Sequence, residues 1–306
     1  MRVAVTGATG FVGGAIVRAL TAAGYEVQAF GRRTPDAATA ALPKYTQWDI
    51  AKGSRPLDVD AVVHCAAAVG QWGPRAQFAS VNEQGTANVV ASAGERARFV
   101  YVSTASVYRR VRDARPITEG SVNAWVSPTS YASTKLGGER VALARRAPTV
   151  VLRPHIVYGP GDSTLWPRVV AARRRATLIV PGDGRNAVSV THVENLAAAV
   201  QRSLDDAVTP GVYNIADAVV PTIDALLRTM FERHGLPTTL RYLQRSLALC
   251  AAAMTELSWW ALRMPGEPRL TRFAVAGFAD PCVLDIERAR RVLGYEPRWT
   301  YLDGPL

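Results

Sequence analysis

Short apolar runs, rich in β-branched residues, alternate with helix-length segments over most of the chain. The apolar runs predict strands at residues 3–6, 26–30, 61–64, 99–103, 149–152 and 212–215. The segments between them predict helices at residues 11–23, 85–96, 130–146 and 193–203. Strands that alternate with helices pair in parallel, because a helix must return the chain to the same end of the sheet. The pattern therefore predicts an α/β fold, a doubly wound parallel sheet with helices on both faces.

The strict alternation ends after Arg153. Prolines at positions 154, 160, 167 and 181 break the following stretch into shorter pieces. We expect one domain over residues 1–153, to whose sheet residues 188–217 return. Residues 154–187 and 218–306 are expected to form a smaller C-terminal lobe that binds the substrate.

A glycine-rich loop directly follows the first predicted strand and opens the first predicted helix. In this context its spacing is typical of a Rossmann turn that binds a dinucleotide. The first glycine permits the turn, the second lets the backbone approach a pyrophosphate, and the third lets helix and strand pack closely; the helix N-terminus offers N–H donors. The predicted contacts are Gly7, Thr9, Gly10, Phe11, Val12 and Gly13.

The second strand should end beside the adenosine ribose, where an acidic residue would favour NAD. This chain has Arg32 and Arg33 there, and two guanidinium groups favour the 2′-phosphate of NADP. The first domain is therefore predicted to bind NADP. Asp49 and Ile50, after the third strand, suit the adenine edge, although Asp49 fits equally well as a helix N-cap.

Tyr131 and Lys135 lie four positions apart on one predicted helix face. Only three of the 36 basic residues are lysines, so Lys135 stands out. An ammonium group can sit beside a phenol and reach the hydroxyls of a bound ribose, which a guanidinium does poorly. The pair predicts a hydride-transfer enzyme in which Tyr131 is the acid/base.

Composition narrows the class of protein further. The net charge of +11 would suit nucleic acid, but the arginines are scattered, so we expect solvated helix faces and no nucleic-acid partner. Cys65, Cys250 and Cys282 lie far apart, which argues against disulfides and metal sites and favours the cytoplasm. A strand pattern begins at residue 2, so no signal peptide is expected.

We also expect no integral membrane segment, because no apolar run reaches 18 residues. The nearest candidate, residues 246–264, contains Glu256 and the pair Trp259 and Trp260. We expect it to line an apolar pocket in preference to contacting a membrane.

Together these motifs resemble the extended short-chain dehydrogenase/reductase superfamily over nearly the whole chain. Further shared patterns lie at residues 63–67, 81–88, 103–108, 153–162 and 293–297. The resemblance implies that Thr104 hydrogen-bonds the substrate oxygen, that Tyr131 transfers the proton, and that Lys135 holds the nicotinamide ribose and lowers the pKa of Tyr131. It also implies a homodimer and further cofactor contacts at Cys65, Ala66, Ala67, Asn82, Val102, Ser103, Pro154 and Ile156.

Within the superfamily, residues 66–73, 153–155 and 268–272 are most similar to the 3β-hydroxysteroid dehydrogenase-like branch, and there to 2-alkyl-3-ketoalkanoate reductases. This resemblance implies NADPH-dependent reduction of a ketone on a bulky apolar substrate, such as a long-chain β-keto acid or a steroid-like ketone. Candidate substrate contacts are Trp72, Thr104, His155, Trp166 and Arg168, with Leu165, Trp259 and Trp260 as further apolar wall.

Two alternatives remain open at this point. A nucleotide-sugar epimerase or dehydratase using internal redox shares these motifs, but that branch commonly has asparagine where this chain has Ile156. A non-catalytic regulator that senses NADP would generally lack the tyrosine or the lysine, and this chain keeps both.

Overall fold

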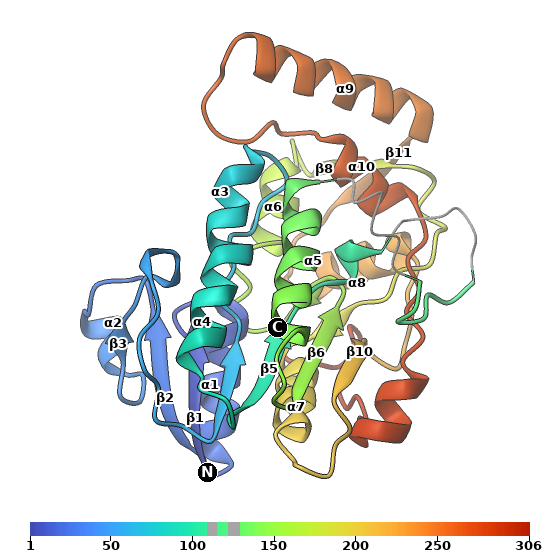
Figure 1. Cartoon of the computed structure of the whole chain (residues 1–306). Coiled ribbons are helices and arrows are strands. Elements are labelled where there is room, and N and C mark those ends of the chain that lie inside the picture. The colour runs from blue at the N-terminus through green and yellow to red at the C-terminus, as the bar shows by residue number, and fades with distance from the viewer. Residues whose placement is uncertain (109–114, 122–128) are drawn as a thin grey trace.

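Seven parallel strands form the central sheet, in the order β10-β6-β5-β4-β1-β2-β3 (Figure 1). The computed structural model describes residues 1–108, 115–121 and 129–306. The predicted α/β fold is confirmed, and each strand whose bounds were predicted lies within two residues of them; the third strand, expected before Asp49 without bounds, is the short β3. The strands are β1 (Arg2–Thr6), β2 (Glu26–Gly31), β3 (Thr46–Gln47), β4 (Ala61–His64), β5 (Arg98–Val102), β6 (Thr149–Pro154) and β10 (Gly211–Ile215).

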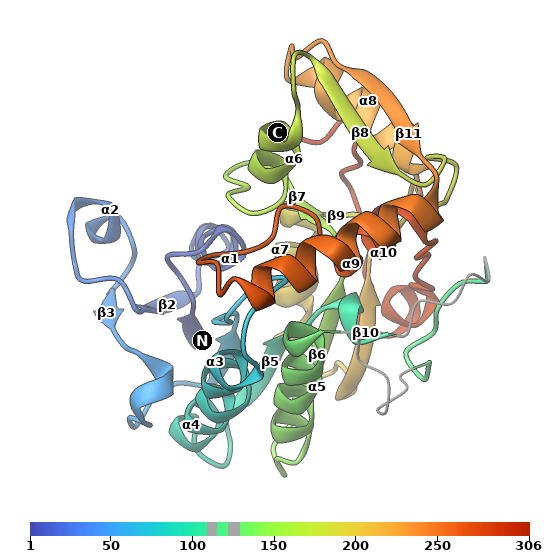
Figure 2. The same cartoon turned by 90° about the horizontal axis from the view of Figure 1, so that it is seen from above.

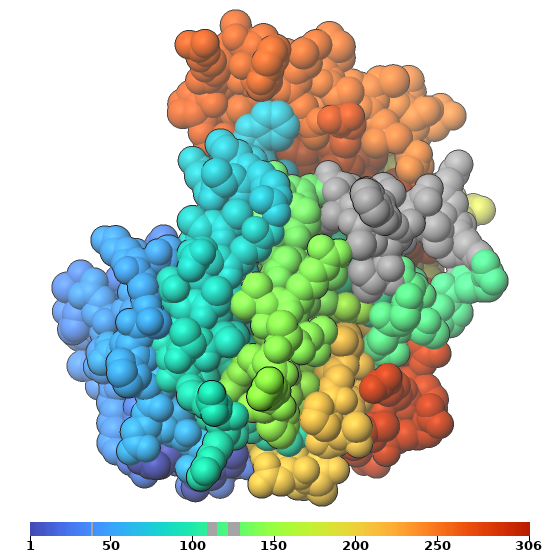
Figure 3. Space-filling model, viewed as in Figure 1, coloured from blue at the N-terminus to red at the C-terminus, as the bar shows by residue number. Residues whose placement is uncertain are grey.

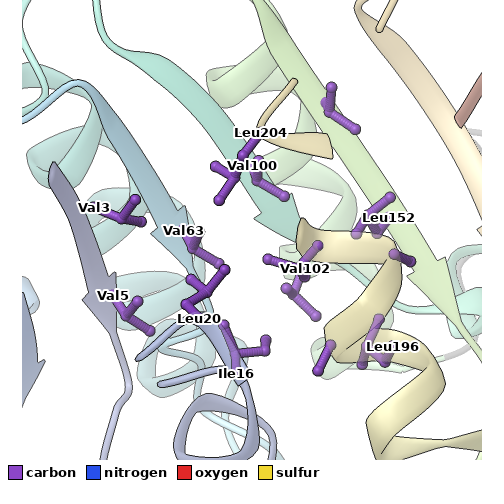
Figure 4. Packing of buried hydrophobic residues seen from close by; sticks show 14 of the residues in the cluster. Val3, Val5, Ile16, Leu20, Val63, Val100, Val102, Leu152, Leu196 and Leu204 are labelled. Carbon is purple, nitrogen blue, oxygen red and sulfur yellow. The ribbon is translucent and has the colours of Figure 1, made fainter. Parts of the chain in front are cut away.

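Helices cover both faces of this sheet. The bounds on one face are α1 (Phe11–Ala22) and α7 (Val193–Ser203), and on the other α3 (Arg75–Ala79), α4 (Thr86–Ser92) and α5 (Ser130–Leu143); the short α2 (Ala37–Ala40) follows β2. Figure 4 shows Ile16 and Leu20 of α1 and Leu196 of α7 packed against the valines of β1, β4 and β5. This apolar layer fixes the carboxyl ends of the strands, where the candidate residues lie.

The helix predicted at residues 85–96 matches α4 at its start but ends earlier, at Ser92, and the helical residues before α4 were not predicted. Helical structure begins at Arg75, and residues Ser80–Gly85 form wider π-helical turns before α4 continues to Ser92. A π-helical stretch moves apolar positions out of the 3.6-residue phase, so the periodicity identified only the part after it.

The strand order reverses between the neighbouring strands β1 and β4, because the chain returns after β3 to the other side of β1. β1 pairs with β2 on one side and with β4 on the other, although β2 follows β1 in sequence and β4 comes later. At such a switch point the loops after the two strands diverge and leave a crevice for a ligand. The glycine loop after β1 and the residues after β4 lie side by side at this switch point, with Gly7 next to Cys65 and Ala66.

The remaining elements gather over the carboxyl ends of the strands (Figures 1 and 2). They include two small parallel strand pairs, β7 (Val157–Tyr158) with β9 (Thr191–His192) and β8 (Thr177–Pro181) with β11 (Thr239–Leu243). The helices there are α6 (Trp166–Ala172), α8 (Ile223–Arg233), α9 (Arg245–Ala261) and α10 (Arg272–Ala279). Within the described residues, no helix has the length and apolar character needed to cross a bilayer.

Candidate active site

The glycine loop has the shape that a bound pyrophosphate needs. Gly7 has φ +73°, and a Cβ there would lie 2.7 Å from the backbone nitrogen of Ala66. A Cβ on Gly13 would lie 2.1 Å from the carbonyl oxygen of Gly7, so only glycine lets α1 approach the loop this closely. Gly10 caps α1 without a side-chain hydrogen bond, and the first turn has no acid. Thr9, Phe11 and Val12 share this turn, whose N–H groups suit a phosphate.

Arg32 and Arg33 follow β2 on a backbone held by two side chains. The Tyr45 hydroxyl donates to the carbonyl oxygen of Arg33 at 2.6 Å, and the Gln47 amide donates to that of Arg32 at 3.2 Å. Both arginine side chains are exposed and make no ion pair with the described residues. The site therefore offers two guanidinium groups to an anion.

Asp49 and Ile50 already have partners in the protein. The Asp49 carboxylate accepts from the Ala51 N–H at 3.1 Å, which is the N-cap arrangement. Ile50 is 6% exposed, and its carbonyl accepts from the Asn88 amide at 2.7 Å. An adenine contact by either residue stays a prediction.

The segment after β4 is held against α5 by Asn82. The Asn82 side chain accepts from the Ala68 N–H at 2.8 Å and donates to the Ala68 carbonyl oxygen at 3.1 Å and to the Thr134 hydroxyl at 3.1 Å. Cys65, Ala66 and Ala67 are thereby fixed next to the glycine loop. His64, just before them, is buried between the hydroxyls of Thr6 and Thr86.

Burial shifts the pKa values of Tyr131 and Lys135, the two groups that we expect to take part in the reaction. It raises the pKa of the Tyr131 phenol to about 12, although a side-chain hydrogen bond with Thr104 opposes the shift. Burial also lowers the pKa of Lys135 to about 8, and the negative charge of the nearby Glu139 carboxylate opposes this shift. Lys135 does not contribute to the shift of the Tyr131 pKa, so the lowering that we expected from it stays a prediction. The phenol stays protonated at neutral pH and is suited to donate a proton.

Lys135 is fixed by the end of β5. Its ammonium donates to the carbonyl oxygen of Val102 at 2.8 Å and lies 4.1 Å from the ring centroid of Tyr101. The side chain is 2% exposed, so this position is set by the core.

A buried ion pair near Lys135 was not predicted from the sequence. Arg153 donates to both carboxylate oxygens of Glu139, at 2.9 and 2.5 Å, and the Ser103 hydroxyl also donates to Glu139 at 2.5 Å. Arg153 further donates to the Tyr108 hydroxyl at 3.0 Å. Glu139 is one helical turn after Lys135, which is the only sequence signal that links it to the site.

Two cavities meet beside Thr104 and Tyr131. The smaller, of about 180 Å³, includes Thr104 and is walled mainly by apolar side chains of α6, α8 and α10. The larger, of about 750 Å³, includes Tyr131. The cavities share Gln71, Ser106 and Phe273, so the space beside the proposed acid/base continues in two directions.

The predicted substrate contacts divide between these cavities. Trp72 and Trp260 line the larger cavity, whereas His155, Leu165 and Trp166 line the smaller one. Trp259 and Arg168 line neither, and Arg168 forms an ion pair with Glu267 at 3.1 Å.

Pro154 ends β6, and the following wall residue, Ile156, has an unusual backbone. Its φ is +43°, a conformation that β-branched residues rarely adopt. Ile156 also lines the smaller cavity. The strained residue therefore lies where a ligand would contact it.

Two distant stretches that suggested the reductase branch meet beside the cavities. The Thr271 hydroxyl donates to the Gln71 side chain at 3.0 Å, and the Gln71 N–H donates to Glu267 at 3.3 Å. Because Gln71 lines both cavities, these hydrogen bonds fix one side chain of their shared wall.

Comparison with known proteins gives matches over most of the chain. The profile of the NAD dependent epimerase/dehydratase family matches residues 3–216. The chain is 33% identical to a 2-alkyl-3-oxoalkanoate reductase of Stenotrophomonas maltophilia, over 99% of this chain and 97% of that protein. It is 31% identical to a 2-alkyl-3-oxoalkanoate reductase of Shewanella oneidensis, over 95% and 81%. The crystal structure of UDP-glucuronic acid 4-epimerase from Bacillus cereus in complex with NAD matches with a TM-score of 0.73 at 21% identity, covering 99% of this chain and 96% of that one, which shows the shared fold.

Proposed function

The chain belongs to the NAD dependent epimerase/dehydratase family, and we propose that it is an NADPH-dependent reductase of a bulky apolar β-keto acid of the 2-alkyl-3-oxoalkanoate kind. An oxidoreductase of the extended short-chain dehydrogenase/reductase type agrees with the names of these relatives. The observation that carries the substrate class is the pair of cavities that meet at Thr104 and Tyr131.

The described residues fit a nicotinamide dinucleotide. The glycine cradle between Gly7 and Gly13 and the uncapped start of α1 suit its pyrophosphate. Arg32 and Arg33 support the choice of NADP, because their guanidinium groups suit a 2′-phosphate. When bound, the cofactor supplies the hydride that reduces the carbonyl carbon.

The chain's own residues would manage the proton. The Tyr131 hydroxyl holds a proton that it donates to the ketone oxygen, and the raised pKa keeps that proton in place until a ketone arrives. Thr104 orients the oxygen, and Lys135 stabilises the phenolate that remains. The same groups serve the reverse oxidation.

The side chains that line the two cavities favour an apolar substrate with a chain on each side of the reacting ketone. Most apolar side chains of the smaller cavity come from α6, α8, α10 and the turn before α6; they include Leu165, Trp166, Ile223, Leu227, Met230 and Phe278. A 2-alkyl-3-keto acid carries a chain on each side of the reacting ketone, and one chain could occupy each cavity. His155 lies in the smaller cavity, where its Nδ1 is 2.8 Å from the Ser189 carbonyl oxygen, and is our candidate for the substrate carboxylate. Arg168 is ion-paired with Glu267.

The test follows NADPH absorbance with purified protein and a panel of 2-alkyl-3-oxo acids, 3-ketosteroids and UDP-sugars. We expect NADPH oxidation with the branched keto acids and a loss of about 10²- to 10⁴-fold in turnover for Tyr131→Phe. Tyr25→Phe, remote from both cavities, is the matched control. Conversion of a UDP-sugar without net NADPH oxidation would instead assign the protein to the epimerases. Cofactor binding without conversion of any substrate would indicate a sensor of NADP.

A further inference from the structure

The outward face of α9 is apolar and uncharged. Figures 1 and 2 show this helix lying across one end of the molecule as its outermost element. Leu247, Met254 and Leu257 are 56%, 64% and 56% exposed, and Cys250 and Ala261 on the same face are exposed as well. These residues follow one another at intervals of three or four, so they form one stripe. A surface helix normally has a polar outer face.

The inner face of α9 accounts for its attachment to the protein. Ala248 and Ala252 pack against Val275 of α10 in a small separate core. The helix has two charged residues, and both are ion-paired with neighbours: Arg245 with Asp280 at 2.7 Å and Glu256 with Arg272 at 2.6 Å. The apolar stripe therefore has no role in these contacts. A contiguous apolar surface of this kind marks an interaction site.

The unpaired charge around the stripe is positive. Residues 234–280 contain three acids, Glu256, Glu267 and Asp280, and each is ion-paired with an arginine. Arg263 and Arg269, just beyond the end of α9, are exposed and form no ion pair within the described part of the chain. A second copy of this face would bring like charges together, whereas an anionic lipid surface would attract them.

The same segment also borders the larger cavity. Glu256 and Trp260 of α9 and Arg272 of α10 line that cavity, and Trp260 is also 72% exposed. Figure 3 shows α9 standing out from the surface above the rest of the chain. A surface that met the outer stripe would therefore lie next to the cavity.

We propose that the outer face of α9 docks on the surface of an anionic lipid bilayer, with the helix parallel to it. Leu247, Met254 and Leu257 enter the apolar layer, while Arg263 and Arg269 meet anionic headgroups. The docked protein holds its larger cavity at the bilayer surface, where an apolar substrate would enter. Docking itself does not depend on the proposed reaction, so either can fail without the other.

Vesicle co-sedimentation tests this directly. The full chain is mixed with vesicles of phosphatidylcholine plus phosphatidylglycerol, and separately with vesicles of phosphatidylcholine alone. We expect binding to the mixed vesicles and much weaker binding to the neutral ones. The double variant Met254→Glu and Leu257→Glu should weaken binding on the order of a hundredfold, since two apolar side chains are replaced by anions. Leu143→Glu, at an exposed site near the end of α5, should bind as the unaltered chain does.

Further variants and measurements distinguish lipid binding from dimerisation and from loss of folding. Arg263→Ser with Arg269→Ser should reduce binding to the mixed vesicles towards the level of the neutral ones. Light scattering gives the mass of each variant in solution, and thermal unfolding confirms that each is folded. If the unaltered chain binds neither kind of vesicle, the proposal is overturned. A dimer that Met254→Glu with Leu257→Glu converts to monomers, without vesicle binding, would assign the stripe to a second copy instead.

Discussion

The two sides of the active site are held by different forces. On the sheet side, polar groups are fixed by buried hydrogen bonds: Lys135 to Val102, Asn82 to Ala68 and Glu139 to Arg153. On the lobe side, apolar side chains of α6, α8 and α10 surround the smaller cavity. Directional bonds specify positions within tenths of an ångström, whereas apolar contact specifies shape and volume.

We infer that the sheet side determines the reaction and that the lobe side determines which substrate binds. The proposed proton transfer needs Thr104 and Tyr131 in one geometry, and the sheet side supplies the rigid backbone for it. An apolar wall can change its side chains without disturbing that geometry. The comparison predicts that substitutions on the sheet side alter catalysis and folding together, while those on the lobe side alter affinity for the substrate.

The largest expected effect comes from Glu139→Gln. Removing one partner of a buried ion pair should lower the free energy of unfolding by about 3–5 kcal/mol, because Arg153 keeps its buried charge. Thermal or denaturant unfolding measures the loss, with the exposed Glu95→Gln as control. A change as small as that of the control would contradict a central role for the pair.

Glu139→Gln should also change how kcat/KM and stability depend on pH. Burial lowers the pKa of Lys135 to about 8 and Glu139 raises it, so removing the Glu139 charge should lower the pKa further. The alkaline fall in kcat/KM, which reports the free enzyme, should therefore move to lower pH. The free energy of unfolding should respond in the opposite sense. Folding disfavours the charged form of Lys135, so the protein should gain stability as pH rises from about 8 towards the pKa that Lys135 has in the unfolded chain. An alkaline limb that stays in place would show that Lys135 does not control it.

The same substitution, glycine to alanine, can be compared on the sheet side, at Gly13 of α1, and on the lobe side, at Gly277 of α10. Gly13→Ala places a methyl group 2.1 Å from the Gly7 carbonyl oxygen and should lower the free energy of unfolding by about 1–3 kcal/mol, with loss of cofactor affinity. Gly277→Ala in α10 meets no heavy atom within 4 Å and should raise it by about 0.5–1 kcal/mol. Equal losses in the two variants, measured by denaturant unfolding, would contradict the contrast between the sides.

The cofactor prediction comes next in size. Arg32→Ser with Arg33→Ser should weaken NADP binding on the order of ten- to a hundredfold and leave NAD binding nearly unchanged, because only NADP carries the 2′-phosphate. Calorimetric titration with both cofactors measures the ratio, and the exposed Arg96→Ser controls for net charge. Similar losses for the two cofactors would mean that these arginines do not read the phosphate.

The local features of the site were predictable from the sequence. The turn at Gly7 and the close approach at Gly13 depend on backbone sterics over a few residues, and the Tyr131 and Lys135 pair depends on helix periodicity. The order of alternating elements was enough to predict the parallel sheet.

Features that depend on tertiary contact were not predictable. Glu139 meets Arg153 across two elements, and Gln71 meets Thr271 200 positions away. No spacing rule connects such residues, because their proximity exists only after the core has packed. The outer face of α9 is a similar case: its sequence suggested a pocket wall, but only the packed structure shows which residues face outward.

The smallest predicted effect concerns the lobe side, at Ile156. Asparagine tolerates a φ of +43° better than isoleucine, so Ile156→Asn should relieve about 1 kcal/mol of strain, which roughly offsets the lost apolar contact. The KM for an apolar keto acid should rise severalfold, since the smaller cavity loses part of its wall. Ile156→Ala is the matched variant: it loses the same contact but not the strain, so it should unfold more easily than Ile156→Asn in a denaturant titration. If alanine proves as stable as asparagine here, the backbone is not strained, and Ile156 was retained for packing alone.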